Sequence, residues 1–483
     1  MASIGKIARR SFLIGSAAIV GGVAFGAYFV ARPAPNPLTP EAGGGALNPF
    51  VLIDANGITL IAPRAEMGQG VHTTWTALIA EELDVELEQV RVLHGPAAQA
   101  YYNTALLGEA LPGKGYDKSD FGHALAETLG RVGKVMNMQV TGGSTSMVDG
   151  YTRMRAAGAS ARETLKQAAA ERLGVDRAEL RSEKAMVIAP DGTEIAYADL
   201  AEAAAGLDPV DAPLRDPSQW RLLGKPVDRV DMVEKVTGTA RFGLDVRLEG
   251  MRFAALRMNP HLGGAMRGFD DSAARAMPGV DRVVNLGTGV AVVASNTWLA
   301  MQAAQAIEID WEMGPNPPDT GAVFDRIAAG LETGANSTLR DDGDAETLPD
   351  GATEITAEYR VPYLAHATME PMNATALYSG VKLEVWSGNQ APLFTRKSCA
   401  KAVGLKPEAV EVHTTYMGGG FGRRGELDFS VYAARVAAEM PGTPVQLAWS
   451  REEDMTHDFY RPGALARFRG AVKDGKAVLL DGR

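Results

Sequence analysis

Cysteine is nearly absent from this sequence, which carries a single thiol, Cys399, among 483 residues. One cysteine cannot form a disulfide within the chain, and it cannot supply the several thiolates that hold an iron–sulfur cluster. We therefore expect any such cluster to lie on another polypeptide.

Positive charge is also scarce. The chain has 48 Lys and Arg residues against 59 Asp and Glu residues, a formal net charge of -11. Nucleic acids bind to basic surfaces, so this balance argues against a nucleic-acid partner. The seven histidines do not cluster at the spacing of metal ligands, and we expect no metal held by protein side chains alone.

Long apolar runs are missing except near the N-terminus, where residues 12–30 follow Arg9 and Arg10. Two arginines before an apolar run fit a twin-arginine export signal, which predicts a periplasmic or periplasm-facing protein. An ordinary membrane-anchoring helix is the alternative. No clear cleavage sequence follows, so membrane anchoring by a retained signal stays open. Twin-arginine export carries folded proteins, usually loaded with a cofactor, and therefore predicts one here.

The rest of the chain has the patterns of a mixed α+β, multidomain protein. Asn56-Gly57 and Asp474-Gly475 each lie between apolar stretches and predict hairpins. Trp75, Leu78, Ile79 and Leu83 recur at helical spacing and predict a helix after Gly70. A helix, a short turn and a strand or extended segment recur three times, around residues 78–93, 163–180 and 396–413. Composition predicts five segments: 1–31 (signal or anchor), 32–47 (linker), 48–212, 213–315 and 316–483.

Short glycine-rich or hydroxyl-rich stretches are where chemistry is expected. Gly68, Gln69 and Gly70 stand between a predicted strand and a predicted helix, where backbone N–H groups could bind an anion and the Gln69 amide could donate and accept. A structural turn is the alternative. Ser144, Thr145 and Ser146 precede another predicted helix and could hold a phosphate or serve only as its N-cap.

A third stretch is richest in glycine. Residues 418–422, Gly-Gly-Gly-Phe-Gly, directly follow a predicted strand, which suggests that backbone lies against a flat or anionic ligand. Arg423 and Arg424 come next and either support that ligand or form a solvated surface pair. A fourth stretch, Arg-Glu-Glu-Asp-Met at residues 451–455, reads by itself as a solvated charged face.

Taken together in this order, the four stretches resemble the molybdopterin-binding subunits of the xanthine dehydrogenase and aldehyde oxidase family, in particular the isoquinoline 1-oxidoreductase beta type. The likeness runs from about residue 48 to the end. In the larger xanthine dehydrogenases the Gly-Gln-Gly segment follows the Gly-Gly-Gly-Phe-Gly segment, whereas here it precedes it, as in the isoquinoline type. The resemblance implies that residues 213–315 contain an a/b hammerhead-like domain and that the flanking regions bind the cofactor.

The resemblance also implies roles for individual residues. The implied cofactor-binding residues are Gly68, Gln69, Gly70, Ser144, Thr145, Ser146, Gln390, Gly419, Gly420, Phe421 and Gly422. Three residues are implied in catalysis. Gln390 would hydrogen-bond an oxo group of molybdenum, Arg461 would orient substrate, and Glu426 stands one position away from a family substrate-binding glutamate.

The implied cofactor is molybdenum held by molybdopterin, with the cytosine dinucleotide form as an alternative. The implied reaction is oxidative hydroxylation of aldehydes or N-heterocyclic aromatics with water as the oxygen source. Implied partners are a small subunit that carries the 2Fe-2S clusters and a c-type cytochrome acceptor.

One family feature is missing from the sequence. The family's general base is a glutamate in a glycine-rich C-terminal segment, and no such segment follows Arg461. We therefore expect a C-terminally truncated molybdenum hydroxylase. The competing interpretation is a catalytically incomplete exported protein that binds the cofactor without turnover.

Overall fold

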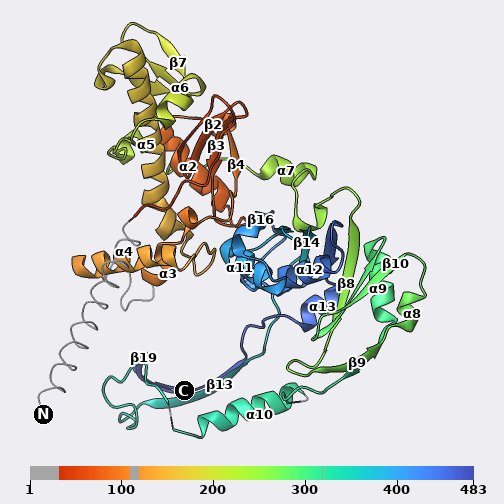
Figure 1. Cartoon of the computed structure of the whole chain (residues 1–483). Helices are drawn as coiled ribbons and strands as arrows, with labels where there is room; N and C mark the ends of the chain where they lie inside the picture. The colour runs from red at the N-terminus through yellow and green to blue at the C-terminus, as the bar shows by residue number, and fades with distance from the viewer. Residues whose placement is uncertain (1–31, 109–118, 318, 335) are drawn as a thin grey trace, which may run out of the picture. The chain divides into compact units, whose positions relative to one another are not determined.

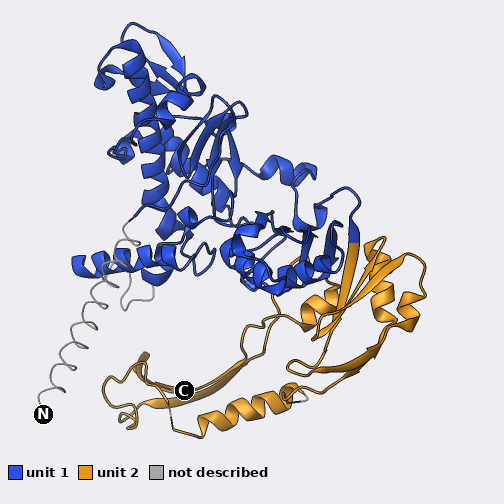
Figure 2. Ribbon diagram, in the orientation of Figure 1, with its two compact units in different colours: residues 1–252, 372–447 blue, residues 253–371, 448–483 orange. Residues whose placement is uncertain are grey.

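The computed structural model describes residues 32–108, 119–317, 319–334 and 336–483 (Figure 1). The predicted export signal, residues 1–31, lies outside this part of the chain. Among the described helices, none is both long enough and apolar enough to cross a membrane. The chain divides into two compact units (Figure 2): unit 1 comprises Met1–Arg252 and Met372–Leu447, and unit 2 comprises Phe253–Pro371 and Ala448–Arg483.

The first part of unit 1 packs two helices against a small sheet. The sheet has the order β1-β2-β3-β4, with strands β1 (Gly45–Asn48), β2 (Val51–Asp54), β3 (Gly57–Ile61) and β4 (Val90–Leu93). The hairpin predicted at Asn56-Gly57 joins β2 and β3, and Gly57 takes the positive φ of 96° that the turn requires.

Helix α2 (Val71–Leu83) lies close to the 28-residue helix α5 (Ser146–Leu173). A Cβ atom on Gly150 would come within 2.4 Å of the Trp75 ring, and one on Gly158 within 2.3 Å of the Ile79 carbonyl oxygen. The close approach therefore depends on these glycines. Trp75 and Leu78, which the helical spacing predicted to share a face, are fully buried in the core between the helices and the sheet.

Further elements complete this part of unit 1. The helices are α3 (Ala105–Gly108), α4 (Asp120–Val135), α6 (Tyr197–Ala205) and α7 (Met232–Thr237). The strands are β5 (Arg181–Glu183), β6 (Met186–Ile188) and β7 (Glu194–Ala196), which form a separate three-stranded sheet.

The second part of unit 1 is a four-stranded arrangement that presents two loops at one edge. Its order is β17-β14-β15-β16, with β14 (Asn373–Tyr378), β15 (Leu383–Ser387), β16 (Val410–Thr414) and β17 (Val445–Ala448). Strands β15 and β16 are parallel, with Ser387 opposite Thr414, and are joined through α11 (Pro392–Ala402); α12 (Asp428–Ala438) follows β16. The carboxyl ends of adjacent parallel strands meet at one edge, where open α/β sheets bind ligands.

Unit 2 contains two groups of strands. The first group comprises β8 (Arg252–Met258), β9 (Met266–Asp270), β10 (Val280–Asn285), β11 (Gly289–Ala294) and β12 (Glu308–Trp311), with helices α8 (Ser272–Arg275), α9 (Thr297–Gln305) and α13 (Arg451–Thr456). The second group is the sheet β13-β18-β19, with β13 (Thr353–Val361), β18 (Ala464–Lys473), β19 (Lys476–Gly482) and helix α10 (Thr320–Leu331). The hairpin predicted at Asp474-Gly475 joins β18 to β19.

These elements confirm the mixed α+β prediction and the threefold pattern. In each instance a helix, a short 3-10 turn and a strand follow one another: α2 to β4, α5 to β5, and α11 to β16. Residues 213–252 lie in unit 1 and residues 253–315 in unit 2. The five segment boundaries drawn from composition stay predictions.

Candidate cofactor site

Four segments that are far apart in the sequence meet around Gln390 in unit 1. The Gln390 carbonyl oxygen accepts from the Thr141 N–H at 2.8 Å, and Gln390 Nε2 donates to the Thr141 carbonyl oxygen at 2.8 Å. Thr141 Oγ1 in turn accepts from the Ala65 N–H at 2.8 Å. The Gln390 N–H donates to the carbonyl oxygen of Arg424 at 2.9 Å. These bonds join four segments: the ones before residues 68–70 and before residues 144–146, and the ones after β15 and after β16.

Gly420 closes this junction from the side of the glycine-rich loop. A Cβ atom there would come within 2.6 Å of Met67 Sδ and 3.1 Å of Gln390 Oε1. Gln390 is 4% exposed, and its Oε1 is a buried atom without a hydrogen-bond partner among the described residues. Since Nε2 must face the Thr141 carbonyl, the amide is oriented with Oε1 toward Gly420. A buried oxygen that accepts no hydrogen bond, such as Gln390 Oε1, suits a ligand that carries a hydrogen-bond donor.

The Gly-Gln-Gly loop differs from the sequence prediction. The backbone N–H groups of Gly68, Gly70 and His72 donate to the carboxylate of Glu66 at 2.8, 3.2 and 3.1 Å. The anion predicted at the N-terminus of α2 is thus a side chain of the protein itself, which the positive end of the helix dipole favours. Glycine is still required here, because φ is 108° at Gly68 and 85° at Gly70.

Gln69 is likewise engaged by its own loop. Its Oε1 accepts from the Met67 N–H at 2.8 Å, and its Nε2 donates to the Ala65 carbonyl oxygen at 2.9 Å. The cofactor contact of this amide stays a prediction. Gln69 here holds the loop in its turn.

The hydroxyl-rich segment is divided between structural and exposed residues. Thr145 is buried at the start of α5, where its Oγ1 accepts from Asn103 Nδ2 and donates to the Gly142 carbonyl oxygen, both at 2.7 Å. Its side chain makes no capping bond to the helix. Ser144 has a positive φ of 56° and is exposed, and Ser146 is half-buried. These two hydroxyls are the ones that remain open to a ligand.

The Gly-Gly-Gly-Phe-Gly loop is supported from inside by arginines. Arg424 Nε donates to the Gly419 carbonyl oxygen at 2.9 Å, and Arg423 forms a two-bond pair with Asp428 at 2.9 Å. Both arginines are buried, so the alternative of a solvated surface pair was wrong.

The same loop leaves Phe421 outside. It is 74% exposed and has a positive φ of 55°, flanked by Gly419 at 94° and Gly422 at 110°. A bulky residue held in this backbone region is strained, and such strain gathers at functional sites.

Two of the predicted catalytic residues lie elsewhere. Glu426 is exposed in unit 1, just after the short helix Arg423–Gly425. Arg461 is exposed in unit 2, where its backbone pairs with Leu364 at 2.9 and 3.3 Å and its Nη2 donates to the Pro362 carbonyl oxygen at 3.1 Å. Neither side chain is among the hydrogen-bond partners of Gln390, and Arg461 belongs to the other unit.

The charged run at residues 451–455 is only partly solvated. It begins α13, and within it Asp454 is buried and accepts from Arg451 Nη1 at 2.8 Å. The interpretation of this run as a plain solvated face was therefore wrong at Asp454.

Sequence reasoning gave no role to three groups at the junction, Glu66, Met67 and Thr141, although they belong to the stretches 66–70 and 141–146. Their neighbours in the sequence carried the recognisable glycines, whereas a single Glu, Met or Thr has no signal of its own. The expectation that no histidine clusters with other metal ligands does not hold for His413. Its ring nitrogen and carboxylate oxygens of Glu384 and Glu411, on β15 and β16, lie within 4.8 Å of one another. Lys382 Nζ donates to both glutamates, at 3.3 and 3.1 Å, and so offsets one of the two negative charges of that surface cluster.

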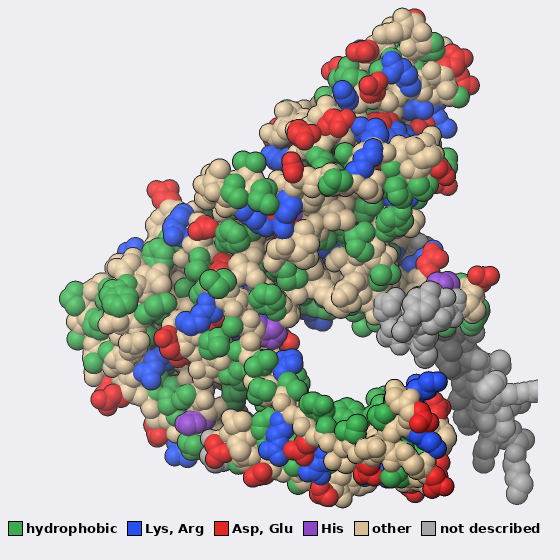
Figure 3. Space-filling model, turned by 180° about the vertical axis from the view of Figure 1, so that it is seen from behind, with side chains coloured by type: hydrophobic (Ala, Val, Ile, Leu, Met, Phe, Trp, Pro, Cys, Tyr) green, Lys and Arg blue, Asp and Glu red, His purple; other side chains and the backbone are tan. Residues whose placement is uncertain are grey.

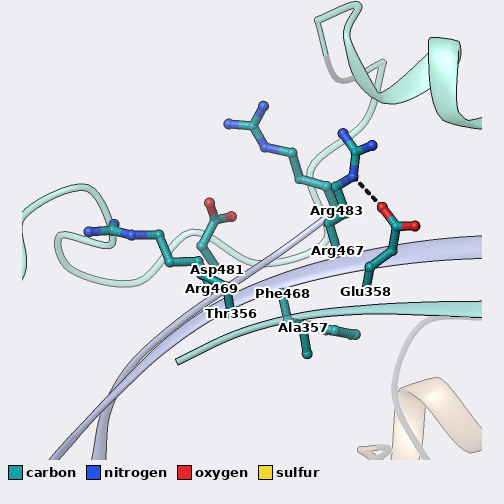
Figure 4. A pocket seen from close by; sticks show the side chains of 8 residues that line it. All are labelled: Thr356, Ala357, Glu358, Arg467, Phe468, Arg469, Asp481 and Arg483. Carbon is teal, nitrogen blue, oxygen red and sulfur yellow. Dashed lines mark hydrogen bonds and ion pairs between the residues drawn. The ribbon is translucent and has the colours of Figure 1, made fainter. Parts of the chain in front are cut away.

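Unit 2 has a separate hollow on the sheet β13-β18-β19 (Figure 4). It measures about 450 Å³ and is lined by residues that include Arg467, Arg469 and Arg483. Arg467 points toward Glu358 and donates to it at 2.7 Å, while Arg469 pairs with Glu354 at 3.2 Å. None of its lining residues is a predicted site residue. Figure 3 shows one face of the molecule, on which basic and acidic side chains are also interspersed.

Comparison with known proteins bears on the part of the chain that contains Gln390. Residues 331–483 match the molybdopterin cofactor-binding domain. The chain is similar to molybdopterin-binding subunits. The predicted resemblance is thereby confirmed, and the matched segment contains Gln390 and the Gly-Gly-Gly-Phe-Gly loop, whereas residues 68–70 and 144–146 precede it.

Individual relatives extend over more of the chain. It is 29% identical to isoquinoline 1-oxidoreductase subunit beta of Brevundimonas diminuta, over 98% of this chain and 63% of that protein. It is 27% identical to a membrane-bound aldehyde dehydrogenase of Gluconacetobacter polyoxogenes, named for pyrroloquinoline quinone, over 96% of this chain and 58% of that protein. The solved quinoline 2-oxidoreductase of Pseudomonas putida 86 is 22% identical, with a TM-score of 0.42, over 52% of this chain and 38% of that one. This chain thus spans about three fifths of the length of the first two relatives.

Proposed function

We propose that this chain binds a molybdopterin cofactor at the junction of Thr141, Gln390 and Gly420, and that it is part of a molybdenum-dependent oxidoreductase. The observation that carries the proposal is the buried Oε1 of Gln390, which has no hydrogen-bond partner among the described residues and against which Gly420 packs closely. A pterin carries N–H donors, so it fits this unused acceptor. The match of residues 331–483 supports the same group.

The protein's own part is to hold and orient the cofactor, which when bound supplies a metal centre able to accept two electrons from a substrate. Gln390 would offer Oε1 as an acceptor, and the second hydrogen of Nε2 remains for another oxygen of the group. Arg424 keeps the Gly419 carbonyl oxygen turned inward, which fixes the glycine loop. Ser144 and Ser146 are the open hydroxyls for the cofactor's phosphate, and the cytosine dinucleotide form would extend from there.

The finer reaction is oxidative hydroxylation of an aldehyde or an N-heterocyclic aromatic, with water as the oxygen source. For substrate contacts we carry over the residues that the resemblance implies, Glu426 and Arg461, both of which are exposed. No residue of this chain is assigned as general base.

Electrons would leave through a partner subunit that carries 2Fe-2S clusters, with a c-type cytochrome as the acceptor. The only cysteine, Cys399, is buried, and burial raises the pKa of its thiol to about 12, which disfavours the thiolate that ligates iron. We also propose export by the twin-arginine route to the periplasm, with membrane anchoring if the signal is retained. The support is the pattern of residues 9–30.

The test is the cofactor content of the full chain, produced in a host that synthesises molybdopterin. Metal analysis would give molybdenum per chain, and oxidation to a fluorescent pterin would give the organic part. We expect about one of each in the wild type and at least a tenfold lower content in Gln390→Met. The matched control is Gln446→Met, because Gln446 is equally buried in unit 1 but bonds to the segment 243–246.

The outcomes separate the candidate functions. A quinone in place of molybdenum would favour pyrroloquinoline quinone, the group in the name of one relative. Equal loss of molybdenum in both variants would remove Gln390 from the site. Full molybdenum with no oxidation of any aldehyde or N-heterocycle in the presence of a dye acceptor would favour the alternative, a catalytically incomplete cofactor-binding protein.

A further inference from the structure

The carboxylate of Glu66 has more partners than the three N–H groups of its own loop. Arg229 Nη2 donates to Glu66 Oε1 at 3.1 Å, and Lys235 Nζ lies 3.8 Å from the same oxygen. The Glu66 side chain is 1% exposed, so its charge is withdrawn from water and depends on these partners.

Arg229 joins three different groups at once. It pairs with Asp231 through two bonds, Nε to Oδ1 at 2.9 Å and Nη2 to Oδ2 at 2.8 Å. Its Nη1 donates to the Gly68 carbonyl oxygen at 2.8 Å. Burial raises the pKa of Asp231, but the bonds and charges of Arg229 and Lys235 outweigh it and hold that pKa well below its usual range. Asp231 is therefore ionised, and Arg229 is the cation that touches the Gly-Gln-Gly loop backbone.

The same short segment reaches the other glycine loop. Lys235, on α7, lies with its Nζ 5.1 Å from the centre of the Tyr416 ring, just before the Gly-Gly-Gly-Phe-Gly loop. Phe242 forms a parallel bridge with Tyr416, and their ring centres are 6.0 Å apart. Residues 229–242 thus tie together the two loops that flank the proposed cofactor position.

We infer that Arg229 is a positioning residue for the cofactor, acting through the Gly-Gln-Gly loop. It fixes Glu66 and the Gly68 carbonyl oxygen, and through them the loop whose Met67 side chain faces Gly420. The inference rests on the proposed function, since it names what keeps that site in shape. No other cation of the described residues is recorded as donating to both the backbone and the acid of this loop.

Loss of Arg229 should loosen the loop without unfolding the unit. Glu66 would keep its three backbone N–H donors and Lys235. The Gly68 carbonyl oxygen would lose its Arg229 donor, and Asp231 would lose both bonds from Arg229 but keep Lys235. Lysine at this position keeps the charge but cannot form the fork, so Arg229→Lys should fall between wild type and Arg229→Gln.

The experiment compares wild type, Arg229→Gln, Arg229→Lys and the control Arg221→Gln. Arg221 is 35% exposed against 29% for Arg229, and it pairs with Glu86 at 2.7 Å, away from the glycine loops. Two quantities are measured on the purified full chain: hydrogen exchange of the amides of residues 66–72 by mass spectrometry, and the half-life of bound molybdopterin by pterin fluorescence after gel filtration. Thermal unfolding is recorded for each variant.

We expect at least tenfold faster exchange at residues 66–72 and at least tenfold faster loss of molybdopterin in Arg229→Gln. We expect unfolding temperatures like that of the control and an intermediate result for Arg229→Lys. Faster exchange with unchanged molybdopterin retention would overturn the inference and leave the proposed function standing. Unchanged exchange would overturn it as well. A wild type without molybdopterin would instead remove the proposed function, and the inference with it.

Discussion

Gln390 and Gly420 face one another at the centre of the candidate site, and a Cβ atom on Gly420 would lie 3.1 Å from Gln390 Oε1. Gly420 is not among the residues with positive φ. Its lack of a side chain therefore serves close approach rather than backbone freedom. Its neighbours Gly419 and Gly422 do have positive φ, so adjacent glycines in one loop have different physical reasons.

This distinction predicts the effect of Gly420→Ala. The added methyl would meet Met67 Sδ at 2.6 Å, and because that atom ends a flexible side chain, we expect a stability loss of about 1 kcal/mol, at the low end for overpacking. Molybdopterin content should fall at least fivefold, since the methyl would press on Gln390 Oε1, the acceptor proposed for the cofactor. Pterin fluorescence and urea unfolding would measure the two effects.

The matched control is Gly425→Ala. A Cβ atom there meets nothing within 4 Å, and Gly425 is also not among the residues with positive φ. It should change neither quantity. Equal molybdopterin content in both variants would contradict the placement of the cofactor beside Gly420.

Gly70 is needed for a different reason than Gly420, because its φ is 85° and the space around it is open. Gly70→Ala should cost about 1 kcal/mol of unfolding free energy through backbone strain alone. Asparagine tolerates the left-handed region better, so Gly70→Asn should recover part of that loss. Urea denaturation of the three proteins measures it, and equal stability of the Ala and Asn variants would argue against strain as the cause.

The sequence made some of these features predictable and not others. Asn56-Gly57, the spacing of Trp75 and Leu78, and the strand before residues 418–422 are local patterns, and local patterns report backbone conformation directly. They gave the hairpin, α2 and the loop that carries Gly420.

Long-range partners were out of reach for a physical reason. Glu66 takes the place of the predicted anion, and Arg424 turns inward to Gly419, only because of contacts that form in the folded chain. The burial of Arg423 and Arg424 has no local signature, since two consecutive arginines in a sequence can equally form a solvated pair. The role of residues 229–242 in joining the two glycine loops was hidden for the same reason.

Two buried histidines predict a dependence of stability on pH. Burial lowers the pKa of His94 to about 3, with the neighbouring His72 adding to the effect, and burial also lowers the pKa of His72. In the unfolded chain both should titrate near pH 6.5. Below that pH the unfolded state binds protons that the folded state does not, so stability falls as pH decreases and is constant above about pH 7.

The expected slope is about 1.4 kcal/mol per pH unit for each histidine once pH is below its unfolded value. Replacing His94 with Gln should remove the contribution of one histidine to the slope of stability against pH. The difference is expected between pH 6 and pH 5, where carboxylates contribute less. Urea midpoints followed by tryptophan fluorescence at pH 8, 7, 6 and 5 would show it. A slope identical in wild type and His94→Gln would mean that His94 is protonated in the folded protein.

Arg424 connects stability to the site most directly. It is fully buried, donates to the carbonyl oxygens of Gly419 and Gly388 at 2.9 and 3.4 Å, and through its own carbonyl oxygen receives the Gln390 N–H. Arg424→Met keeps much of the volume but leaves these buried acceptors without donors, which should cost about 2–4 kcal/mol. Molybdopterin content should fall with it, because the freed glycine loop no longer fixes Gly420.

The exposed pair Arg131–Glu127 provides the control, since Arg131→Met should change stability by less than about 1 kcal/mol and leave the cofactor in place. A destabilised Arg424→Met protein that still holds full molybdopterin at low temperature would show that the loop is shaped by the cofactor itself rather than by the arginine beneath it.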